Sequence, residues 1–111
     1  MRVEILQIRG CPNVAVLEQR LREAAASERV DVEIVHWVVD DPSEAAAAGM
    51  AGSPTLLVDG REPFAVVGQV PSLSCRLYRS ENGALVGAPS VAALRAAVRA
   101  AASGSAGGQC N

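Results

Sequence analysis

The chain of 111 residues is long enough for one domain and too short for two. Half of its residues are hydrophobic, the formal net charge is −2 and lysine is absent, so the clustered positive charge that a nucleic-acid partner requires is missing. No apolar run reaches the roughly 18 residues of a membrane helix, and the first residues enter a strand-like pattern without the apolar core of a secretory signal, so we expect a cytoplasmic protein that binds neither nucleic acid nor membrane.

The first two elements are a strand and a helix. Residues 3–8 are mostly apolar and β-branched, which predicts a buried strand. Residues 9–13 read Arg-Gly-Cys-Pro-Asn and interrupt it, and a helix follows that either Asn13 caps or Pro12 begins. This helix is amphipathic over about three to four turns. Its apolar face is formed by Val14, Leu17, Leu21 and Ala24.

A second strand and a second helix come next. Apolar and charged residues alternate from residue 30 and pass into an apolar run that ends at residue 39, which predicts a half-buried strand. Residues 41–44 read Asp-Pro-Ser-Glu and predict the start of an alanine-rich helix that stops at Gly49. Strand, helix and strand over about 35 residues form a βαβ unit, so we expect the two strands to be parallel.

A proline-led segment follows the second helix. Residues 52–60 predict a short strand that starts at Pro54 and ends in an Asp-Gly turn. Two prolines and a glycine argue against a long regular element in residues 61–73. Residues 74–79 fit either a strand or a single helical turn.

The end of the chain combines a helix with a polar tail. Ser90 is a capping residue for a final helix with an apolar face, and Arg95 and Arg99 lie on its opposite, solvated face. The chain then becomes rich in glycine and serine, which predicts a flexible tail. We therefore expect one domain over residues 1–102 and a tail over residues 103–111.

The cysteines do not form a recognisable framework. Cys11, Cys75 and Cys110 are odd in number and widely spaced, and in a reducing compartment they are expected to be free thiols. No pair has C-x-x-C spacing, and the single histidine, His36, is far from all three in sequence, so we expect no metal site and no cofactor. His36 is interpreted as a packing or edge residue of its strand.

Two local sequences connect these elements to a known fold. Residues 10–14 read Gly-Cys-Pro-Asn-Val between the first strand and the first helix, and residues 53–55 read Ser-Pro-Thr at the third strand. Together with the order of elements, they resemble the thioredoxin/glutaredoxin superfamily over residues 1–60 and 87–102. The resemblance implies an α/β, thioredoxin-like fold, with a central mixed β-sheet flanked by helices in the order β-α-β-α-β-β-α and an insert before the last strand.

The same resemblance implies a site. Cys11 corresponds to the nucleophile at the start of the first helix, and Pro54 to the cis-proline that faces the nucleophile and helps to bind an extended substrate. The other substrate-binding residues that it implies are Pro12, Ser53 and Thr55. The family's second active-site cysteine falls at position 14, where this chain has Val14. The site is therefore monothiol, and a two-cysteine cycle cannot run within this motif.

Each of the two cysteines within the predicted domain has two interpretations. A helix N-terminus offers a positive dipole and unpaired N–H groups, which favour the nucleophilic thiolate of Cys11. The alternative is an inert thiol packed under the helix. Cys75 is either a small buried hydrophobe in a core strand or a resolving cysteine, the latter if residues 61–73 fold back over Cys11 and Pro54.

Longer segments resemble a narrower group of proteins. Residues 53–60, 62–64, 74–78 and 87–90 are similar to short stand-alone bacterial proteins that are labelled thioredoxin family proteins or, in some cases, alkylmercury lyases. Cleavage of a carbon–mercury bond requires two converging thiols and a proton donor. The sequence offers the two thiols, and whether they converge is a matter for the tertiary structure.

Three functions follow, and the expected partner is a thiol or disulfide compound, either a protein or a small molecule. The first is monothiol disulfide exchange through Cys11 opposite a cis-Pro54, which would make the chain a thiol–disulfide oxidoreductase. The second is a non-catalytic thioredoxin-fold binding module, which Val14 at the resolving position favours. The third is an organomercurial or metal-thiol protein that uses Cys11 and Cys75.

Overall fold

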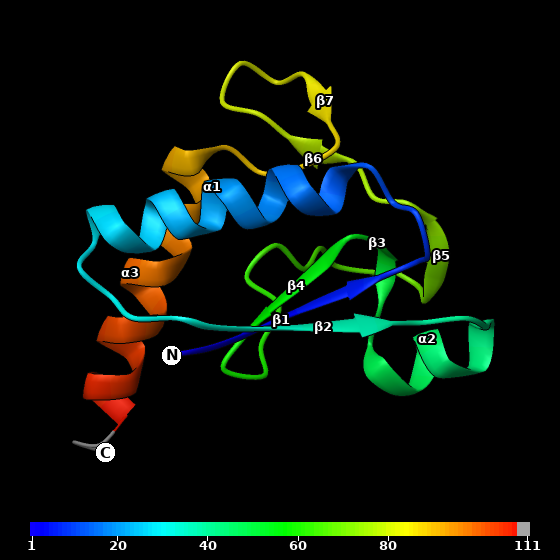
Figure 1. The fold of residues 1–111 in the computed structure, drawn as a ribbon, viewed down its shortest axis with the longest axis horizontal. Coiled ribbons are helices and arrows are strands. Elements are labelled where there is room, and N and C mark those ends of the chain that lie inside the picture. The colour runs from blue at the N-terminus through cyan, green and yellow to red at the C-terminus, as the bar shows by residue number, and fades with distance from the viewer. Residues whose placement is uncertain (109–111) are drawn as a thin grey trace.

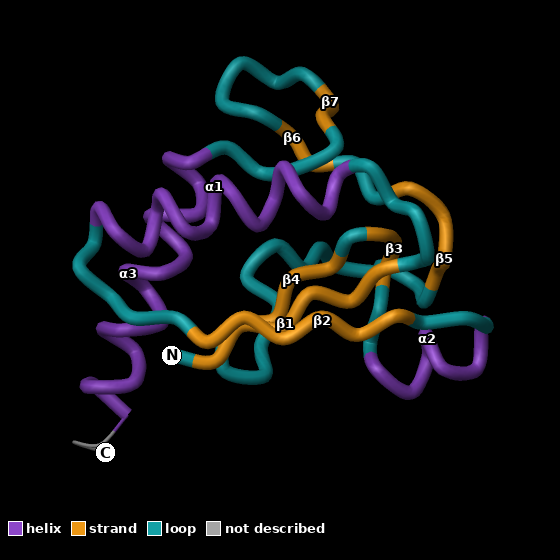
Figure 2. The backbone as a smooth tube through the Cα atoms, viewed as in Figure 1, coloured by secondary structure: helices purple, strands orange, loops and turns teal. Residues whose placement is uncertain are grey.

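A computed structural model describes residues 1–108 of the chain. Its central sheet has three strands in the order β2-β1-β4 (Figure 2). Strand β1 (Arg2–Gln7) pairs in parallel with β2 (Glu33–Val38) and antiparallel with β4 (Thr55–Val58). The sheet is therefore mixed, and the parallel pair that the βαβ pattern predicts is confirmed.

Helices cover both faces of this sheet (Figure 1). The helices α1 (Asn13–Ser27) and α3 (Val91–Gly108) pack together on one face, and α2 (Pro42–Ala48) lies on the other. Side chains alternate along β1, because successive residues of a strand point to opposite faces. Val3 and Ile5 therefore join the core with α1 and α3, whereas Leu6 packs with Ala45 of α2.

The amphipathic pattern of the first helix is confirmed. The residues that it buries are Val14, Leu17, Leu21, Ala24 and Ala25. Pro12 takes the N-cap position, and no side chain caps the first turn, so Asn13 does not act as the cap. The side chain of Asn13 instead lies against Gly87, where a Cβ atom would approach it to within 2.5 Å.

Helix α2 begins and ends where the sequence predicts. The Asp41 side chain accepts a hydrogen bond of 2.9 Å from the backbone N–H of Glu44, and Pro42 is the first helical residue. Gly49 ends the helix with φ of 74°, a left-handed conformation that glycine adopts without steric cost. Local capping chemistry is thus sufficient to fix both ends of this short helix.

The structure has more strands than the predicted order contains. The segment around Pro54 forms two strands, β3 (Ala51–Ser53) and β4, and β3 pairs in parallel with β5 (Ser72–Cys75). The strands β6 (Tyr78–Arg79) and β7 (Leu85–Val86) form a hairpin that projects beyond α1 (Figure 1). A single strand over residues 74–79 is therefore wrong, because β5 ends at Cys75 and β6 begins at Tyr78.

The segment after β4 leaves the sheet because of one proline. Asp59 and Gly60 have φ of 48° and 83°, as in the turn that favours a tight hairpin, and Val58 and Arg61 exchange two backbone hydrogen bonds of 2.7 and 3.0 Å. The next hydrogen-bonded position of that ladder is Pro63, which has no N–H to donate. The hairpin stops after one bridge, and the chain turns toward β3 and β5.

The final helix is longer than predicted. The Ser90 hydroxyl accepts a hydrogen bond of 3.1 Å from the backbone N–H of Ala93, as expected of a cap. The helix then continues to Gly108, so residues 103–108 are helical where the sequence predicts the start of a flexible tail at residue 103. Once a helix has formed, each added residue gains one backbone hydrogen bond. The alanine-rich helix therefore extends past glycines, although each glycine lowers helix stability by about 1 kcal/mol relative to alanine. The rest of the predicted tail, with Cys110, lies outside the described residues.

The two arginines of α3 bind the end of α1. Arg99 and Arg95 each lie 2.9 Å from the Glu28 carboxylate, so this face of the helix is paired as well as solvated. Hydrogen bonds from Arg99 and Arg95 lower the pKa of Glu28 to about 2. Within residues 1–108, no helix has both the length and the apolar character that crossing a membrane requires.

The burial of α1 predicts a difference between two neighbouring residues. Leu17 is fully buried, so Leu17→Ala should lower the free energy of unfolding by about 2–5 kcal/mol. Val16 is 38% exposed on the same helix, and Val16→Ala should change it by no more than about 0.5 kcal/mol. Urea unfolding of both variants measures the difference, and equal losses would contradict this description of the core.

Candidate thiol site

Cys11 lies in the connection between β1 and α1. It is half-buried and packs against the core that α1 and α3 share. Its carbonyl accepts the backbone N–H of Val14 at 3.4 Å, and Pro12 beside it is exposed. Cys11 also lines a groove of about 620 Å³ along one side of α1. The thiol therefore stands at a helix start and at the border between core and solvent.

The turn at Pro54 forms a corner of the structure next to β1. The Ser53–Pro54 bond is cis, as the sequence predicts. The Ser53 hydroxyl accepts a hydrogen bond of 3.1 Å from the backbone N–H of Ile8, which follows β1. The Thr55 hydroxyl donates to the Gly52 carbonyl at 2.6 Å. Both side chains are buried and serve the turn, because a buried hydroxyl requires a partner. The substrate-binding role of Ser53 and Thr55 stays a prediction.

Tyr78 connects this corner to the thiol. Its hydroxyl donates a hydrogen bond of 2.5 Å to the Pro54 carbonyl, and its ring meets Phe64 edge to face at 5.6 Å. Burial raises the pKa of Tyr78 to about 12; the Arg76 charge opposes this rise, and the charges of Glu62 and Cys11 add to it. Tyr78 thus holds the Pro54 carbonyl from a buried position near Cys11.

Arg76 is the only buried residue with a cationic side chain among residues 1–108. Its guanidinium pairs with Glu62, donates to the carbonyl of Phe64 at 2.8 Å and to that of Ala51 at 3.4 Å. It also lies over the Tyr78 ring, 5.0 Å from its centroid. The first part of the segment after β4 is therefore folded back onto the corner at Pro54.

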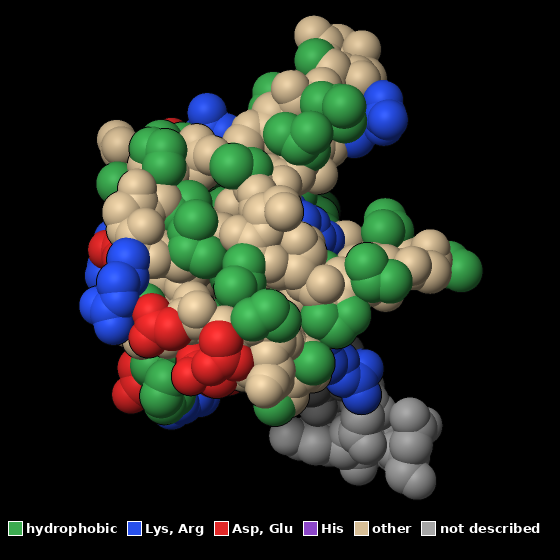
Figure 3. Space-filling view, turned by 90° about the vertical axis from the view of Figure 1, so that its right-hand side faces the viewer, with side chains coloured by type: hydrophobic (Ala, Val, Ile, Leu, Met, Phe, Trp, Pro, Cys, Tyr) green, Lys and Arg blue, Asp and Glu red, His purple; other side chains and the backbone are tan. Residues whose placement is uncertain are grey.

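The second part of that segment points away from the corner. The most exposed large hydrophobic side chains of the described residues belong to it, namely Val66, Val67 and Val70. Figure 3 shows two separate projections on one side of the molecule, and both carry hydrophobic side chains. Residues 61–73 thus approach the site in one part and stand away from it in another.

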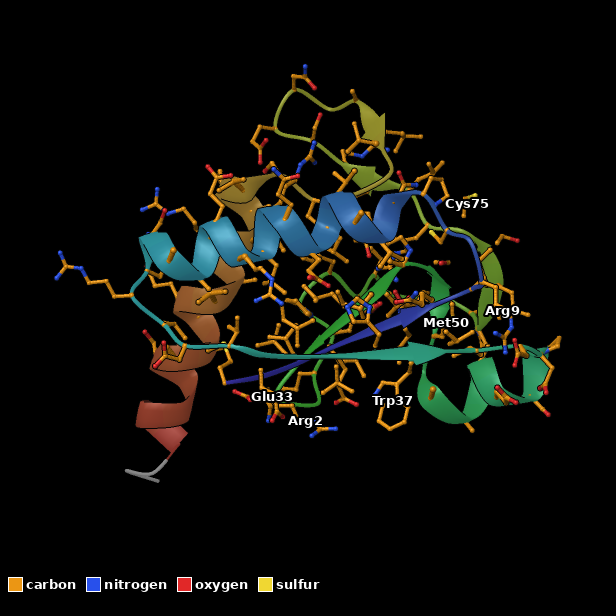
Figure 4. All side chains as sticks on the ribbon, viewed as in Figure 1. Arg2, Arg9, Glu33, Trp37, Met50 and Cys75 are labelled. Carbon is orange, nitrogen blue, oxygen red and sulfur yellow. The ribbon has the colours of Figure 1, made fainter. Side chains whose placement is uncertain are left out.

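Cys75 reaches the same corner from β5. It is exposed, and its partner in the β3–β5 ladder is Ser53. Because the Ser53 hydroxyl binds the N–H of Ile8, Cys75 lies at the end of the sheet where β1 leads into α1 (Figure 4). The interpretation of Cys75 as a buried strand residue is wrong, since β5 ends at this residue and its side chain stays accessible.

A polar cluster borders the groove beside Cys11. The ring nitrogens of His36 lie 2.7 Å from Gln7 Oε1 and 2.5 Å from Glu18 Oε1. Partial burial raises the pKa of Glu18, but hydrogen bonds from His36 and Arg22 outweigh it and leave this pKa lowered. His36 is on the edge strand β2, as the sequence indicates. Among residues 1–108, no three His, Cys, Asp or Glu side chains gather where they could hold a metal ion.

The sequence did not predict the long-range contacts that hold the corner at Pro54 in place. Glu62, Arg76 and Tyr78 carry no local periodic signal, because Arg76 meets Glu62 across 14 positions and Tyr78 meets Pro54 across 24. One signal was available: Arg76 is a charge within a short, strand-like segment, and such a charge needs a partner if it is buried. Its partner was not identifiable without the fold.

Comparison with known proteins identifies the family. The family model described as the thioredoxin domain matches residues 1–75, which runs from β1 to the end of β5. The chain belongs to the thioredoxin-domain family. No curated protein and no solved structure gives a significant match. The matched range includes Cys11, the cis Ser53–Pro54 bond and Cys75, while Arg76 and Tyr78 follow it directly.

Val14 has a structural role in this thioredoxin domain. Val14 is buried in the core that α1 shares with β1, β4 and α3. A side chain that is packed there contributes to stability through burial of apolar surface. Position 14 of this thioredoxin domain therefore belongs to the core, and the second thiol of the described residues, which is exposed, is on β5.

The environment of Tyr78 predicts a loss of stability at high pH. Its pKa is about 12 in the folded protein, against an ordinary value of 10.0. Protonated Tyr78 therefore contributes to the stability of the folded protein. This contribution is complete below about pH 10 and is lost as the pH rises toward 12, because Tyr78 releases its hydroxyl proton at a lower pH in the unfolded chain than in the folded protein. The difference corresponds to roughly 2–3 kcal/mol.

Tyr78 is the single tyrosine of the chain, so the tyrosinate absorbance in a pH titration reports on it alone. The folded protein should titrate well above the unfolded chain. Unfolding measured over the same pH range should lose this part of its pH dependence in Tyr78→Phe. Titration of the folded protein at the ordinary tyrosine pKa would contradict the placement of Tyr78.

Proposed function

We propose that this thioredoxin-domain protein carries out thiol–disulfide exchange, with Cys11 as the nucleophile opposite the cis Ser53–Pro54 turn. The observation that carries the proposal is geometric: Cys11 lies directly before the first turn of α1, and the cis Ser53–Pro54 turn is fixed beside the end of β1 by the hydrogen bonds of Ser53 and Tyr78. The partner is a thiol or disulfide compound. The setting is the cytoplasm, where low-molecular-weight thiols keep cysteines reduced.

The position of Cys11 supports nucleophilic chemistry. A thiolate, not a thiol, attacks a disulfide, and the start of a helix favours the negative charge. Cys11 lies directly before the N-cap Pro12 of α1, and it lines a groove that is open to solvent. Cys11 itself is half-buried, so part of this residue is accessible to a partner.

The first chemical step is an exchange that balances within the two reactants. The Cys11 thiolate attacks one sulfur of a disulfide, and a new S–S bond forms as the old one breaks. The departing sulfur leaves as a thiolate and takes a proton from water. The product is a mixed disulfide on Cys11, and no electrons are gained or lost by the pair as a whole.

The second step needs another thiol, and Cys75 is the internal candidate. Its thiolate would attack the Cys11 sulfur, release the bound thiol and leave a Cys11–Cys75 disulfide, which two low-molecular-weight thiols can reduce again. Cys75 is exposed and is paired with Ser53 at the corner beside the β1–α1 connection. Without Cys75, a low-molecular-weight thiolate would attack the partner's sulfur in the mixed disulfide. It would form a new disulfide with that partner and release the Cys11 thiolate.

Two alternatives rest on particular observations. A non-catalytic binding module is favoured by Val14, which is buried at the position of the family's resolving cysteine. An organomercurial or metal-thiol protein would use Cys11 and Cys75 together, and Cys75 is an exposed thiol that pairs with Ser53, directly before Pro54. The same cysteine variants separate these alternatives from disulfide exchange.

The experiment compares Cys11→Ser and Cys75→Ser in a Cys110→Ser background, with a chromogenic aromatic disulfide as the probe. Cys11→Ser should reduce the rate of thiolate release to that of the uncatalysed exchange. Cys75→Ser should retain the first step and accumulate a mixed disulfide on Cys11, which intact-protein mass spectrometry detects.

Each alternative has its own outcome in this experiment. If Cys11 reacts no faster than free cysteine, the binding module is the better account. If both variants abolish methylmercury binding but the parent protein leaves the disulfide probe unchanged, the metal-thiol reading replaces exchange. Wild-type rates in Cys11→Ser would remove Cys11 from the mechanism.

A further inference from the structure

The backbone hydrogen-bonding groups on the outer edge of β3 are already paired with another segment of the same chain. The Ser53 carbonyl, immediately before cis-Pro54, accepts the backbone N–H of Arg76 at 3.0 Å. At the other end of the strand, the Met50 carbonyl accepts the N–H of Ser72 at 2.9 Å. Strand β5 therefore occupies the backbone positions next to the corner at Pro54.

A close approach at Gly52 indicates that this pairing is built into the fold. Gly52 has φ of 115°, and a Cβ atom there would lie 3.0 Å from the Cβ of Arg76 and 3.1 Å from its Cα and from the carbonyl oxygen of Ser74. A side chain at position 52 would push β5 away, so only glycine permits the contact. The buried Arg76 then holds the end of β5 through its pair with Glu62.

An occupied strand edge limits what can bind beside it. An extended polypeptide commonly docks by adding its backbone hydrogen bonds to a free strand edge. At β3 those bonds are already made within the chain, between β3 and the segment from Ser72 to Arg76. A disulfide within a polypeptide would have to displace β5 before it could lie along β3.

Cys11 faces solvent through a groove and not along a strand edge. The groove of about 620 Å³ that it lines runs along α1, away from the ladder, and other lining residues are Gly10, Ala15, Glu18 and Arg22. Its volume falls within the range of about 300–1,000 Å³ that is typical of small-molecule sites. Its walls offer one carboxylate and one guanidinium, 3.2 Å apart.

We infer that the chain uses β5 to fill the strand edge beside Cys11, and that its exchange partners are low-molecular-weight disulfides rather than polypeptide disulfides. The inference rests on the proposed function. In the exchange, the Cys11 thiolate attacks a small disulfide R–S–S–R, forms Cys11–S–S–R and releases R–S⁻, which takes a proton from water. A second small thiol, after losing its proton, attacks the R sulfur and restores the Cys11 thiolate.

The test uses the double variant Cys75→Ser with Cys110→Ser, in which Cys11 is the one remaining cysteine. Mixed-disulfide formation is followed by mass spectrometry with bis(2-hydroxyethyl) disulfide and with native insulin, whose disulfides are intact. Each rate is divided by the rate of N-acetylcysteine with the same disulfide, which removes differences in intrinsic reactivity. The normalised rate should be higher for the small disulfide by at least about tenfold, the equivalent of about 1.4 kcal/mol.

Two further variants release β5 in this background. Gly52→Ala introduces the clash with Arg76 and Ser74, and Gly68→Ala is its matched control, because Gly68 also has a positive φ, of 80°, but open space around it. Arg76→Met with Glu62→Gln removes the anchor without leaving a buried charge unpaired, in case Gly52→Ala does not fold. Faster hydrogen exchange at the amides of Ser72 and Arg76 reports that β5 has left β3.

The released variants should react with insulin faster, so that the preference for the small disulfide falls, and Gly68→Ala should keep it. Equal normalised rates for both disulfides in the parent would overturn the inference and leave the proposed function intact. An unchanged preference after hydrogen exchange has reported release would overturn the role of β5. A Cys11 that reacts with neither disulfide would overturn the proposed function and this inference together.

Discussion

The second half of the chain depends on the ion pair and the hydrogen bonds of one buried group, the guanidinium of Arg76. A charge that is removed from water is costly unless it is paired and fully hydrogen-bonded. Glu62, the carbonyl of Phe64 and the carbonyl of Ala51 meet that need for Arg76. These partners come from β3 and from the segment after β4, so the guanidinium joins parts of the chain that no continuous ladder connects.

The candidate site takes its shape from this anchor. Arg76 continues β5 on one side, where Cys75 pairs with Ser53, and it leads into Tyr78 on the other, where the hydroxyl binds the carbonyl of Pro54. Glu62 and Phe64, at the start of the segment after β4, are therefore part of this corner. A local event, the end of a hairpin ladder at a proline, thus frees the chain to reach the corner at Pro54.

The chain combines a familiar position for its first thiol with an unusual one for its second. Val14 is packed in the core one turn into α1, where it adds to stability and offers no chemistry. The second thiol of the described residues, Cys75, is carried by a strand that pairs beside the cis-proline. The packed side chain at position 14 and the exposed thiol therefore lie on different elements, α1 and β5.

Contacts between near neighbours could be read from the sequence. The caps at Asp41, Gly49 and Ser90 act within one turn of a helix, and the Asp-Gly turn after β4 acts within two residues. The place of Cys11 at the start of α1 also follows from a short motif. In each of these cases the interacting groups lie a few positions apart, and the sequence pattern contains both of them. The cis bond before Pro54 was implied instead by the resemblance to the superfamily, which rests on the whole order of elements.

The tertiary structure alone decided how distant segments meet. Arg99 binds Glu28 across 71 positions, Tyr78 binds Pro54 across 24, and Cys75 is set opposite Ser53 by the β3–β5 ladder. The hydroxyls of Ser53 and Thr55 face inward for the same reason, since their partners are backbone groups of a turn that exists only in the fold. A sequence specifies the local preferences of each segment, but the choice of partner depends on which buried polar and charged groups the folded chain must satisfy together.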